Sequence, residues 1–528
     1  MNILDYSIIG LYLVGMLAIG FVLRDQKGEK DYFLGGNNIG WFPLSLSTMA
    51  TQLSAISFIS APAFVGMREG GGLKWLTFEF GVPLAMVFVM FVVAPALYRA
   101  KVVSIYDYLE QRVGQSTRLL ISLFFQVVRS FSTGIVIYAP ALILESVLGI
   151  QLWQSIVAVG FISLVYSVMG GMKAVVYSDA IQMFLIFGGL LIVGIYAVGE
   201  VGGLAAFAQK VDPARLVAVD FSAVGLAGDE FGFLPMLFGG FVLYVSYYGC
   251  DQTQAQRILS AKDLGAARKL LTANGLLRFP LVLIYCLTGL VVGVAMMQAP
   301  ELMARIPADR PDYMMPIFIV EYLPHGIIGL LMVAILSAAM SSVSSGMNSL
   351  AAVTLEDLKS IGRGPDTAEK EIIWARNLSI VWGIAIVGLS FFAGSIAQTV
   401  IEAINKVGSA LYGPVLGVFL LAILSKNRTA SAVNIGLLTG LALNLYFWMF
   451  VPELFWMWWN LIGLLVTVGV AQLIMIVTPS RTAMASVEVG VSLFRVENLR
   501  LTAFLTGFFA LIVSISLLTP NLRALLGA

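Results

Sequence analysis

One apolar segment of the chain reads TMATQLSAISFISAP over residues 48–62. Five of its fifteen residues are Ser or Thr, and Pro62 cannot continue a regular helical hydrogen-bond pattern. Irregular backbone survives at membrane depth only inside protein or beside a cavity. We therefore predict that this segment is a partly unwound membrane helix beside a cavity.

The composition of the whole chain supports a membrane setting. Of 528 residues, 59% are apolar and 12% are charged, against roughly 25% charged residues in soluble domains. The mean hydropathy is +0.92. A net charge of +1 indicates no nucleic-acid partner, and two cysteines with one histidine argue against a disulfide framework or His-based catalysis. We expect a protein of the lipid bilayer that is not an enzyme.

Fourteen apolar runs are long enough to cross a bilayer, which takes about 20 residues. They cover roughly 4–23, 41–67, 74–98, 118–148, 152–170, 175–199, 231–256, 274–298, 313–357, 377–397, 401–424, 432–451, 456–478 and 500–519. Of the 31 Lys and Arg residues, 22 fall in alternate connections and 7 in the others. Basic residues mark the cytoplasmic side. This bias predicts that both termini lie outside and that Arg257 and Arg278 belong to a cytoplasmic loop.

Two of these runs look interrupted. One contains residues 48–62, and the other contains Gly239-Gly240 followed by a polar, Tyr-rich stretch. They are five spans apart, which puts them at matching positions of two inverted five-helix halves. We predict one all-α transmembrane transporter domain over 1–528, with an extra N-terminal helix (4–23), a first repeat (41–199), a second repeat (231–424) and accessory helices (432–519). The alternative is that these small residues only allow close helix packing.

The ninth span contains a run of serines, LSAAMSSVSSGMN, over residues 336–348. Ser341, Ser344 and Ser345 share one helical face. Hydroxyl oxygens carry no fixed charge, and together with free carbonyls of an unwound helix they suit a small hard cation such as Na⁺. The alternative is a packing seam of small residues.

Two charged residues fall within predicted spans. Arg129 follows Arg118 by eleven residues, or about 16 Å of helix, and at that depth it needs an anion. The partner is either a substrate carboxylate or an internal one, with Glu79 and Glu145 as candidates. Asp179 is either functional or a solvated residue near the interface, because Lys173 is close in sequence.

Several segments resemble the sodium:solute symporter family. They are residues 31–41, the stretch GGMKAVVYSD at 170–179, Asp251-Gln252 with Gln256-Arg257, the serine run, and residues 408–417. The resemblance implies a five-plus-five inverted-repeat fold that works by alternating access. One departure is Tyr177-Ser178, where many members have Trp-Thr.

The resemblance also implies site residues. A first sodium site would use the carbonyls of Ala50, Leu53 and Ala338 and the hydroxyls of Ser341 and Ser342. A second would use Asp179, Ser344 and Ser345, which implies two Na⁺ ions and no organic cofactor. The substrate positions would be Ser54, Ser57, Glu79, Arg129 and Tyr244, and Tyr247 would be the inner gate. Arg129 matches the arginine that sialic-acid members use for the substrate carboxylate.

We therefore expect a sodium-coupled symporter of a small organic anion, such as sialic acid or another sugar acid or monocarboxylate. The alternatives are a sodium- or proton-coupled carrier of a neutral or zwitterionic solute, and, from another class, an intramembrane enzyme or sensor. We expect no obligate protein partner. The compact loops favour a bacterial inner membrane as the location.

Overall fold

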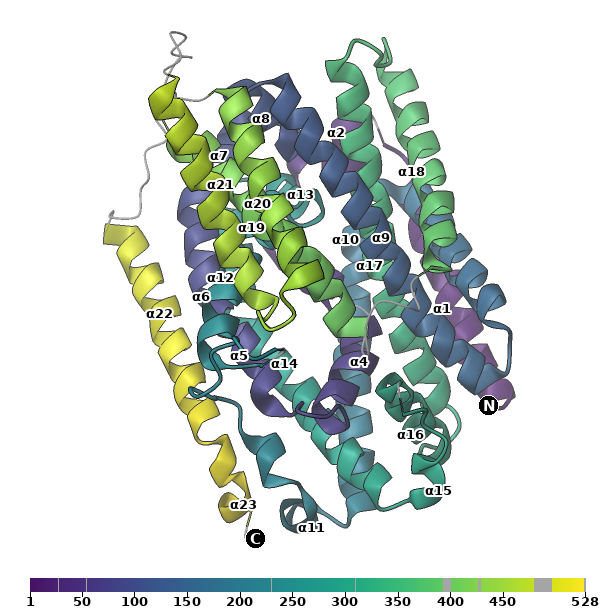
Figure 1. Cartoon of the computed structure of the whole chain (residues 1–528). Helices are drawn as coiled ribbons and strands as arrows, with labels where there is room; N and C mark the ends of the chain where they lie inside the picture. Colours follow the sequence, from purple (N-terminus) through teal and green to yellow (C-terminus); the bar gives the residue numbers. More distant parts are fainter. Residues whose placement is uncertain are drawn as a thin grey trace.

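The computed structural model describes residues 1–26, 28–53, 55–228, 230–308, 310–392, 400–425, 429–478 and 496–526. The described chain is a bundle of long helices (Figure 1), and its one β-type pairing is an isolated bridge between Ile39 and Ala261. The start of α1 and the short α23 lie toward the same end of the bundle (Figure 1). The all-helical fold class is thus confirmed, whereas the side of the membrane that holds the termini stays a prediction.

The long helices that build the bundle are α1 (Ile3–Val22), α9 (Gln115–Leu148), α10 (Leu152–Val201), α12 (Phe233–Cys250), α14 (Leu264–Met297), α17 (Ile327–Ser360), α18 (Ala368–Ser390), α19 (Val400–Leu424), α20 (Ala430–Phe450), α21 (Met457–Val477) and α22 (Val496–Leu517). The shorter helices are α2 (Glu29–Leu34), α3 (Trp41–Gln52), α4 (Ala55–Gly66), α5 (Leu76–Glu79), α6 (Gly81–Phe88), α7 (Ala94–Ala100), α8 (Ile105–Arg112), α11 (Leu204–Lys210), α13 (Gln252–Ser260), α15 (Pro300–Met303), α16 (Met314–Tyr322) and α23 (Leu522–Leu525).

Twelve helices in the described part of the chain are long and apolar enough to cross a membrane, and the bent pair of α3 and α4 makes thirteen. Helix α10 has 50 residues, a length of about 75 Å that is more than twice the hydrocarbon core. Its backbone leaves helical geometry at Gly171, with φ 54° and ψ −153°. Two crossings in α10 would give the fourteen spans that the sequence predicts.

The first predicted interruption is present. Helix α3 ends at Gln52, α4 begins at Ala55, and the two are bent by 53°. Leu53 lies between them with φ −89° and ψ 76°. Because α3 stops here, the carbonyls of its last turn lack the donors that a following turn would supply.

The second predicted interruption is wrong in position. Helix α12 continues through Gly239 and Gly240, and the chain leaves helical geometry only at Asp251. The two glycines serve close packing instead, because a Cβ on Gly239 would lie 2.3 Å from the carbonyl oxygen of Met457. The ninth predicted span (313–357) is also too long, since α16 is separate and α17 begins at Ile327.

The serine-rich helix α17 occupies the centre of the bundle. Residues 331–353 are all buried, and the helix packs against α9, α10, α18 and α1. A helix that is buried on every side belongs to the interior rather than to a lipid-facing surface. Its hydroxyl groups are therefore directed at other helices, including α3 and α4.

Close packing holds α4 against α14. A Cβ on Gly289 of α14 would lie 2.5 Å from the carbonyl oxygen of Pro62, and one on Gly66 would lie 2.3 Å from the carbonyl oxygen of Gly289. We expect Gly289→Ala to push the two helices apart and to destabilise the protein by roughly 1–3 kcal/mol. The lower melting temperature should be visible in detergent. Gly188→Ala is the control, because nothing lies within 4 Å of that added Cβ; equal melting temperatures for the two variants would contradict the packing argument.

Candidate substrate and cation site

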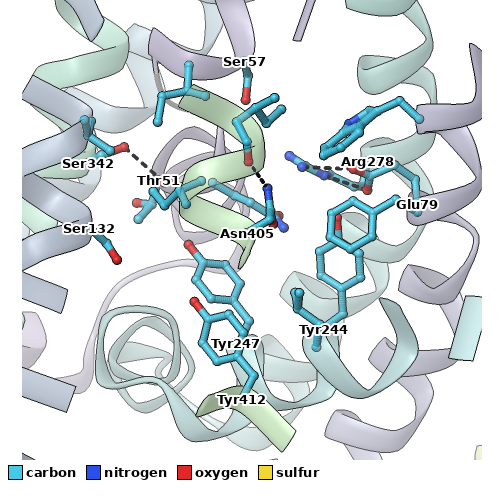
Figure 2. A pocket seen from close by; sticks show the side chains of 18 of the residues that line it. Thr51, Ser57, Glu79, Ser132, Tyr244, Tyr247, Arg278, Ser342, Asn405 and Tyr412 are labelled. Carbon is cyan, nitrogen blue, oxygen red and sulfur yellow. Dashed lines mark hydrogen bonds and ion pairs between the residues drawn. The ribbon is translucent and has the colours of Figure 1, made fainter. Parts of the chain in front are cut away.

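A polar cavity lies where α3 and α4 break. Figure 2 shows it between the broken helix and side chains of α5, α9, α12, α14, α17 and α19. Among the predicted residues, Ser57, Glu79, Arg129, Tyr244, Tyr247 and Ser342 line it. Six aromatic residues also line it: Trp75, Phe78, Tyr244, Tyr247, Tyr285 and Tyr412. Ser54 lies outside the described residues.

Arg129 lies at one end of this cavity and forms an ion pair with Asp251. Its guanidinium carbon is 5.7 Å from the ring centre of Tyr247. Asp251 is also the N-cap of α13, since its Oδ1 accepts a hydrogen bond of 2.8 Å from the amide of Thr253. The internal carboxylate beside Arg129 is therefore Asp251 rather than Glu79, and the sequence reasoning did not single out Asp251 as a charge partner.

A second, smaller cavity is lined by both partners of this ion pair. Arg129, Ser132 and Tyr412 line both cavities, and Asp251 lines the smaller one. Tyr247 and Tyr412 stand side by side at this end of the main cavity (Figure 2), with ring centres 6.0 Å apart. Arg129 and Tyr412 thus belong to the walls of both cavities.

Glu79 pairs with Arg278 in the wall of the main cavity (Figure 2). Arg278 Nε is 3.0 Å from Glu79 Oε2, and Arg278 Nη2 is 3.2 Å from Glu79 Oε1. Both side chains are buried. The prediction that Arg278 belongs to a cytoplasmic loop is wrong, because α14 begins at Leu264 and carries Arg278 about 21 Å along its length.

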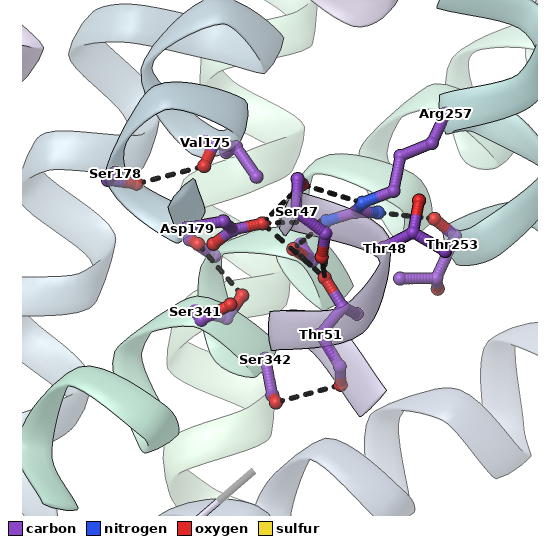
Figure 3. Close-up of polar contacts among 12 residues, drawn as sticks. Ser47, Thr48, Thr51, Val175, Ser178, Asp179, Thr253, Arg257, Ser341 and Ser342 are labelled. Carbon is purple, nitrogen blue, oxygen red and sulfur yellow. Dashed lines mark hydrogen bonds and ion pairs between the residues drawn. The ribbon is translucent and has the colours of Figure 1, made fainter. Parts of the chain in front are cut away.

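The first predicted sodium site brings together neutral oxygens. Ser342 Oγ donates to the carbonyl oxygen of Thr51 at 3.1 Å and to that of Ala338 at 3.4 Å. Ala50 and Leu53 lie on the same broken end of α3, and both are buried. The Ser341 hydroxyl is directed toward the Asp179 carboxylate, and Ser341 therefore lies between the two predicted sodium sites (Figure 3).

The second predicted sodium site is built around Asp179, which is fully buried and not at a solvated interface. Asp179 Oδ2 accepts hydrogen bonds from Ser47 Oγ at 2.6 Å and from Arg257 Nη2 at 2.9 Å (Figure 3). The same guanidinium nitrogen lies 2.5 Å from Ser345 Oγ. Ser344 Oγ donates to the carbonyl of Ser341 at 3.1 Å.

The assignment of Arg257 to a cytoplasmic loop is also wrong. Its side chain is 1% exposed and reaches the interior from the short helix α13. One signal for this position is present in the sequence, because Arg257 belongs to the Asp251–Arg257 stretch that carries the family resemblance. Its depth could not be seen, because α13 is too short and too polar to register as a span.

A membrane bundle in which a broken helix and an inner serine-rich helix border a polar cavity is typical of a secondary active transporter. Residues 32–440 match the model of the sodium:solute symporter family. The protein belongs to the sodium:solute symporter family.

Three relatives are each 32% identical to this chain. The human sodium/iodide cotransporter matches over 84% of this chain and 69% of its own length. A putative sodium-dependent multivitamin transporter of Drosophila melanogaster matches over 83% of this chain and 73% of its own length. The sodium-coupled monocarboxylate transporter 1 of Xenopus laevis matches over 84% of this chain and 71% of its own length.

Two solved structures share the fold. A substrate-bound, outward-open Na⁺-coupled sialic acid symporter superposes with a TM-score of 0.80 at 24% identity, over 92% of this chain and all of that one. Mhp1, a nucleobase-cation-symport-1 family transporter, superposes with a TM-score of 0.55 at 14% identity, again over 92% of this chain and all of that one. These similarities confirm the fold class, while the repeat boundaries 41–199 and 231–424 stay predictions.

The Glu79–Arg278 pair yields a stability prediction. Neutralising one partner leaves an uncompensated buried charge, which costs roughly 3–5 kcal/mol. We expect Glu79→Gln and Arg278→Gln each to lower the melting temperature more than the double variant does. If neither single variant lowers the melting temperature, the two charges do not stabilise each other. The same holds if the loss in the double variant equals the sum of the two single losses.

Proposed function

We propose that this protein is a sodium-coupled symporter that carries a small organic anion across a cell membrane by alternating access. The solute class is a carboxylate, such as a monocarboxylate or a sugar acid like sialic acid. The observation that carries the proposal is Arg129, whose side chain is 14% exposed and lines the main cavity while only its Nη2 is engaged by Asp251. A guanidinium has five N–H donors, so donors remain for a substrate carboxylate.

The names of the relatives support an anionic solute. Those named for iodide and for monocarboxylates carry anions, and the structural neighbour is named for sialic acid, which is itself a carboxylic acid. The carboxylate would lie against Arg129, and Ser57, which lines the same cavity, would contribute a hydroxyl group. Ser54 stays a prediction from the family resemblance. The aromatic residues Trp75, Phe78 and Tyr244 would contact the rest of the solute.

Sodium would bind first between the broken end of α3 and α17. The donors would be the carbonyls of Ala50, Leu53 and Ala338 with the hydroxyls of Ser341 and Ser342. The contact of Ser342 Oγ with the carbonyl of Thr51 on α3 supports this placement. A bound ion would hold the break in the geometry that shapes the adjacent cavity, which links sodium binding to solute binding.

Tyr247 would act as the inner gate. Its hydroxyl accepts a hydrogen bond of 3.1 Å from Gln254 Nε2 of α13, and its ring contacts that of Tyr412. Together with the Arg129–Asp251 pair, these rings would form the closed gate at one end of the main cavity. Solute release on the predicted cytoplasmic side would need them to separate. A bacterial inner membrane remains our prediction for the location.

A zwitterionic solute is the second candidate. Glu79 and Arg278 place a carboxylate and a cation side by side in the cavity wall. A solute with both an amine and a carboxylate could interact with both groups. The uptake experiment below includes such solutes as competitors.

Uptake into proteoliposomes tests the coupling and the solute class together. With an inward Na⁺ gradient, labelled monocarboxylates and sialic acid should accumulate, and replacement of Na⁺ by K⁺ should abolish accumulation. Iodide, neutral sugars and amino acids serve as competitors. Accumulation that is undiminished in K⁺ would reject sodium coupling, and competition by an amino acid alone would favour the zwitterion.

Arg129→Gln should weaken carboxylate uptake. Loss of a charge-assisted hydrogen bond of about 1.5–3 kcal/mol corresponds to roughly tenfold to hundredfold weaker binding. Because the change leaves Asp251 unpaired, the variant Arg129→Gln with Asp251→Asn separates a folding defect from a binding defect. If this neutral pair transports the carboxylate with unchanged affinity, Arg129 does not recognise the solute.

Ser342→Ala should raise the Na⁺ concentration for half-maximal uptake by about tenfold, since one oxygen donor is lost. Ser390→Ala is a matched control, because Ser390 also donates to a backbone carbonyl, that of Val387 at 2.6 Å, but lies on α18. An equal effect of both changes on Na⁺ dependence would place the ion elsewhere.

A further inference from the structure

Arg257 contacts two of the three residues predicted to hold a second sodium ion, Asp179 and Ser345, and also two neighbouring hydroxyl groups. Its Nη2 lies 2.9 Å from Asp179 Oδ2 and 2.5 Å from both Ser345 Oγ and Thr51 Oγ1. Its Nε lies 2.8 Å from Ser47 Oγ. The guanidinium is thus the resident cation of this cluster, and it carries the same charge as the ion expected there.

We propose that Arg257 is a tethered cation that competes with the second Na⁺ for Asp179, so that this ion binds only when Arg257 is displaced. The inference rests on the proposed sodium coupling and concerns how the second site is controlled. Asp179 provides one negative charge to the cluster. It can neutralise the guanidinium or a sodium ion, but two cations in contact with the same oxygens would repel each other.

The positions of Asp179 and Arg257 in the fold indicate which of the two side chains moves when Na⁺ binds. Asp179 lies within the long helix α10, which packs against α17, α3 and α14. Arg257 lies on α13, a helix of nine residues bounded by extended backbone at Asp251 and Ala261. A short segment between two non-helical residues can shift more easily than the middle of a long packed helix.

Helix α13 also carries the counter-ion of the substrate arginine. Asp251 at its N-cap pairs with Arg129, and Arg257 six residues later pairs with Asp179. Displacement of Arg257 by Na⁺ therefore loosens the same helix that holds Arg129 at the end of the main cavity. The second ion thereby acts on the inner gate through α13, without any contact of its own with the solute.

The test is the Na⁺-dependent melting temperature of the purified full-length protein, with KCl replacing NaCl at constant ionic strength. Arg257→Gln removes the competing cation and leaves Asp179 unpaired. We expect the Na⁺ concentration for half-maximal stabilisation to fall at least tenfold and the stabilisation to be specific to Na⁺. Arg257→Lys keeps a charge but loses the planar set of donors, so a smaller fall is expected.

Two further variants complete the design. Arg363→Gln, which changes an exposed arginine, should respond to Na⁺ as the wild type does. The double variant Asp179→Asn with Arg257→Gln removes both charges. It should not show the lower half-maximal Na⁺ concentration that is expected of Arg257→Gln alone. The proposal is overturned if Arg257→Gln lowers stability equally in Na⁺ and K⁺ with an unchanged half-maximal concentration. Where Arg257→Gln does not fold, an unchanged concentration in Arg257→Lys overturns it.

The outcome also separates this inference from the proposed function. A wild-type protein that Na⁺ does not stabilise, and whose uptake proceeds in K⁺, contradicts sodium coupling itself. A wild-type protein that responds to Na⁺, with Arg257 variants that respond identically, contradicts only the competition at Asp179.

Discussion

At the depth of the hydrocarbon core an isolated ionised side chain costs several kcal/mol. Charged side chains in the interior of this protein therefore need partners of opposite charge. The carboxylates of Glu79, Asp179 and Asp251 each face an arginine. In every case one partner lies before residue 200 and the other after residue 250, so the pairs connect elements of the two predicted repeats. Each pair is neutral as it stands, and a mobile ion that replaces one partner changes which elements are held together.

Neutral oxygens complement these pairs at the break between α3 and α4. At the end of α3 the carbonyl of Thr51 accepts a hydrogen bond from the hydroxyl of Ser342 on α17, which lies at the centre of the bundle. Such a site can hold an alkali ion without a buried carboxylate to compensate. Because the same break borders the main cavity, an ion that fixes the break also shapes the solute site, and this is a physical basis for symport.

The sequence was sufficient for the fold class, the break near residues 48–62 and the central serine helix, because each depends on composition or helical periodicity. It was insufficient for the pairing of charges. Arg257 and Arg278 adjoin apolar runs and look like loop residues, yet α13 turns inward and α14 begins fourteen residues before Arg278. Local spacing reveals partners within one helix only, whereas all three core pairs join distant segments.

Reciprocal binding to the purified protein tests the central claim most directly. The affinity for the transported carboxylate is measured with increasing Na⁺, and the affinity for radioactive sodium with increasing carboxylate. If Na⁺ and the carboxylate stabilise the same conformation, each ligand must increase the affinity for the other by the same factor. We predict a factor well above one. Affinities that do not depend on the other ligand in either direction would contradict the account.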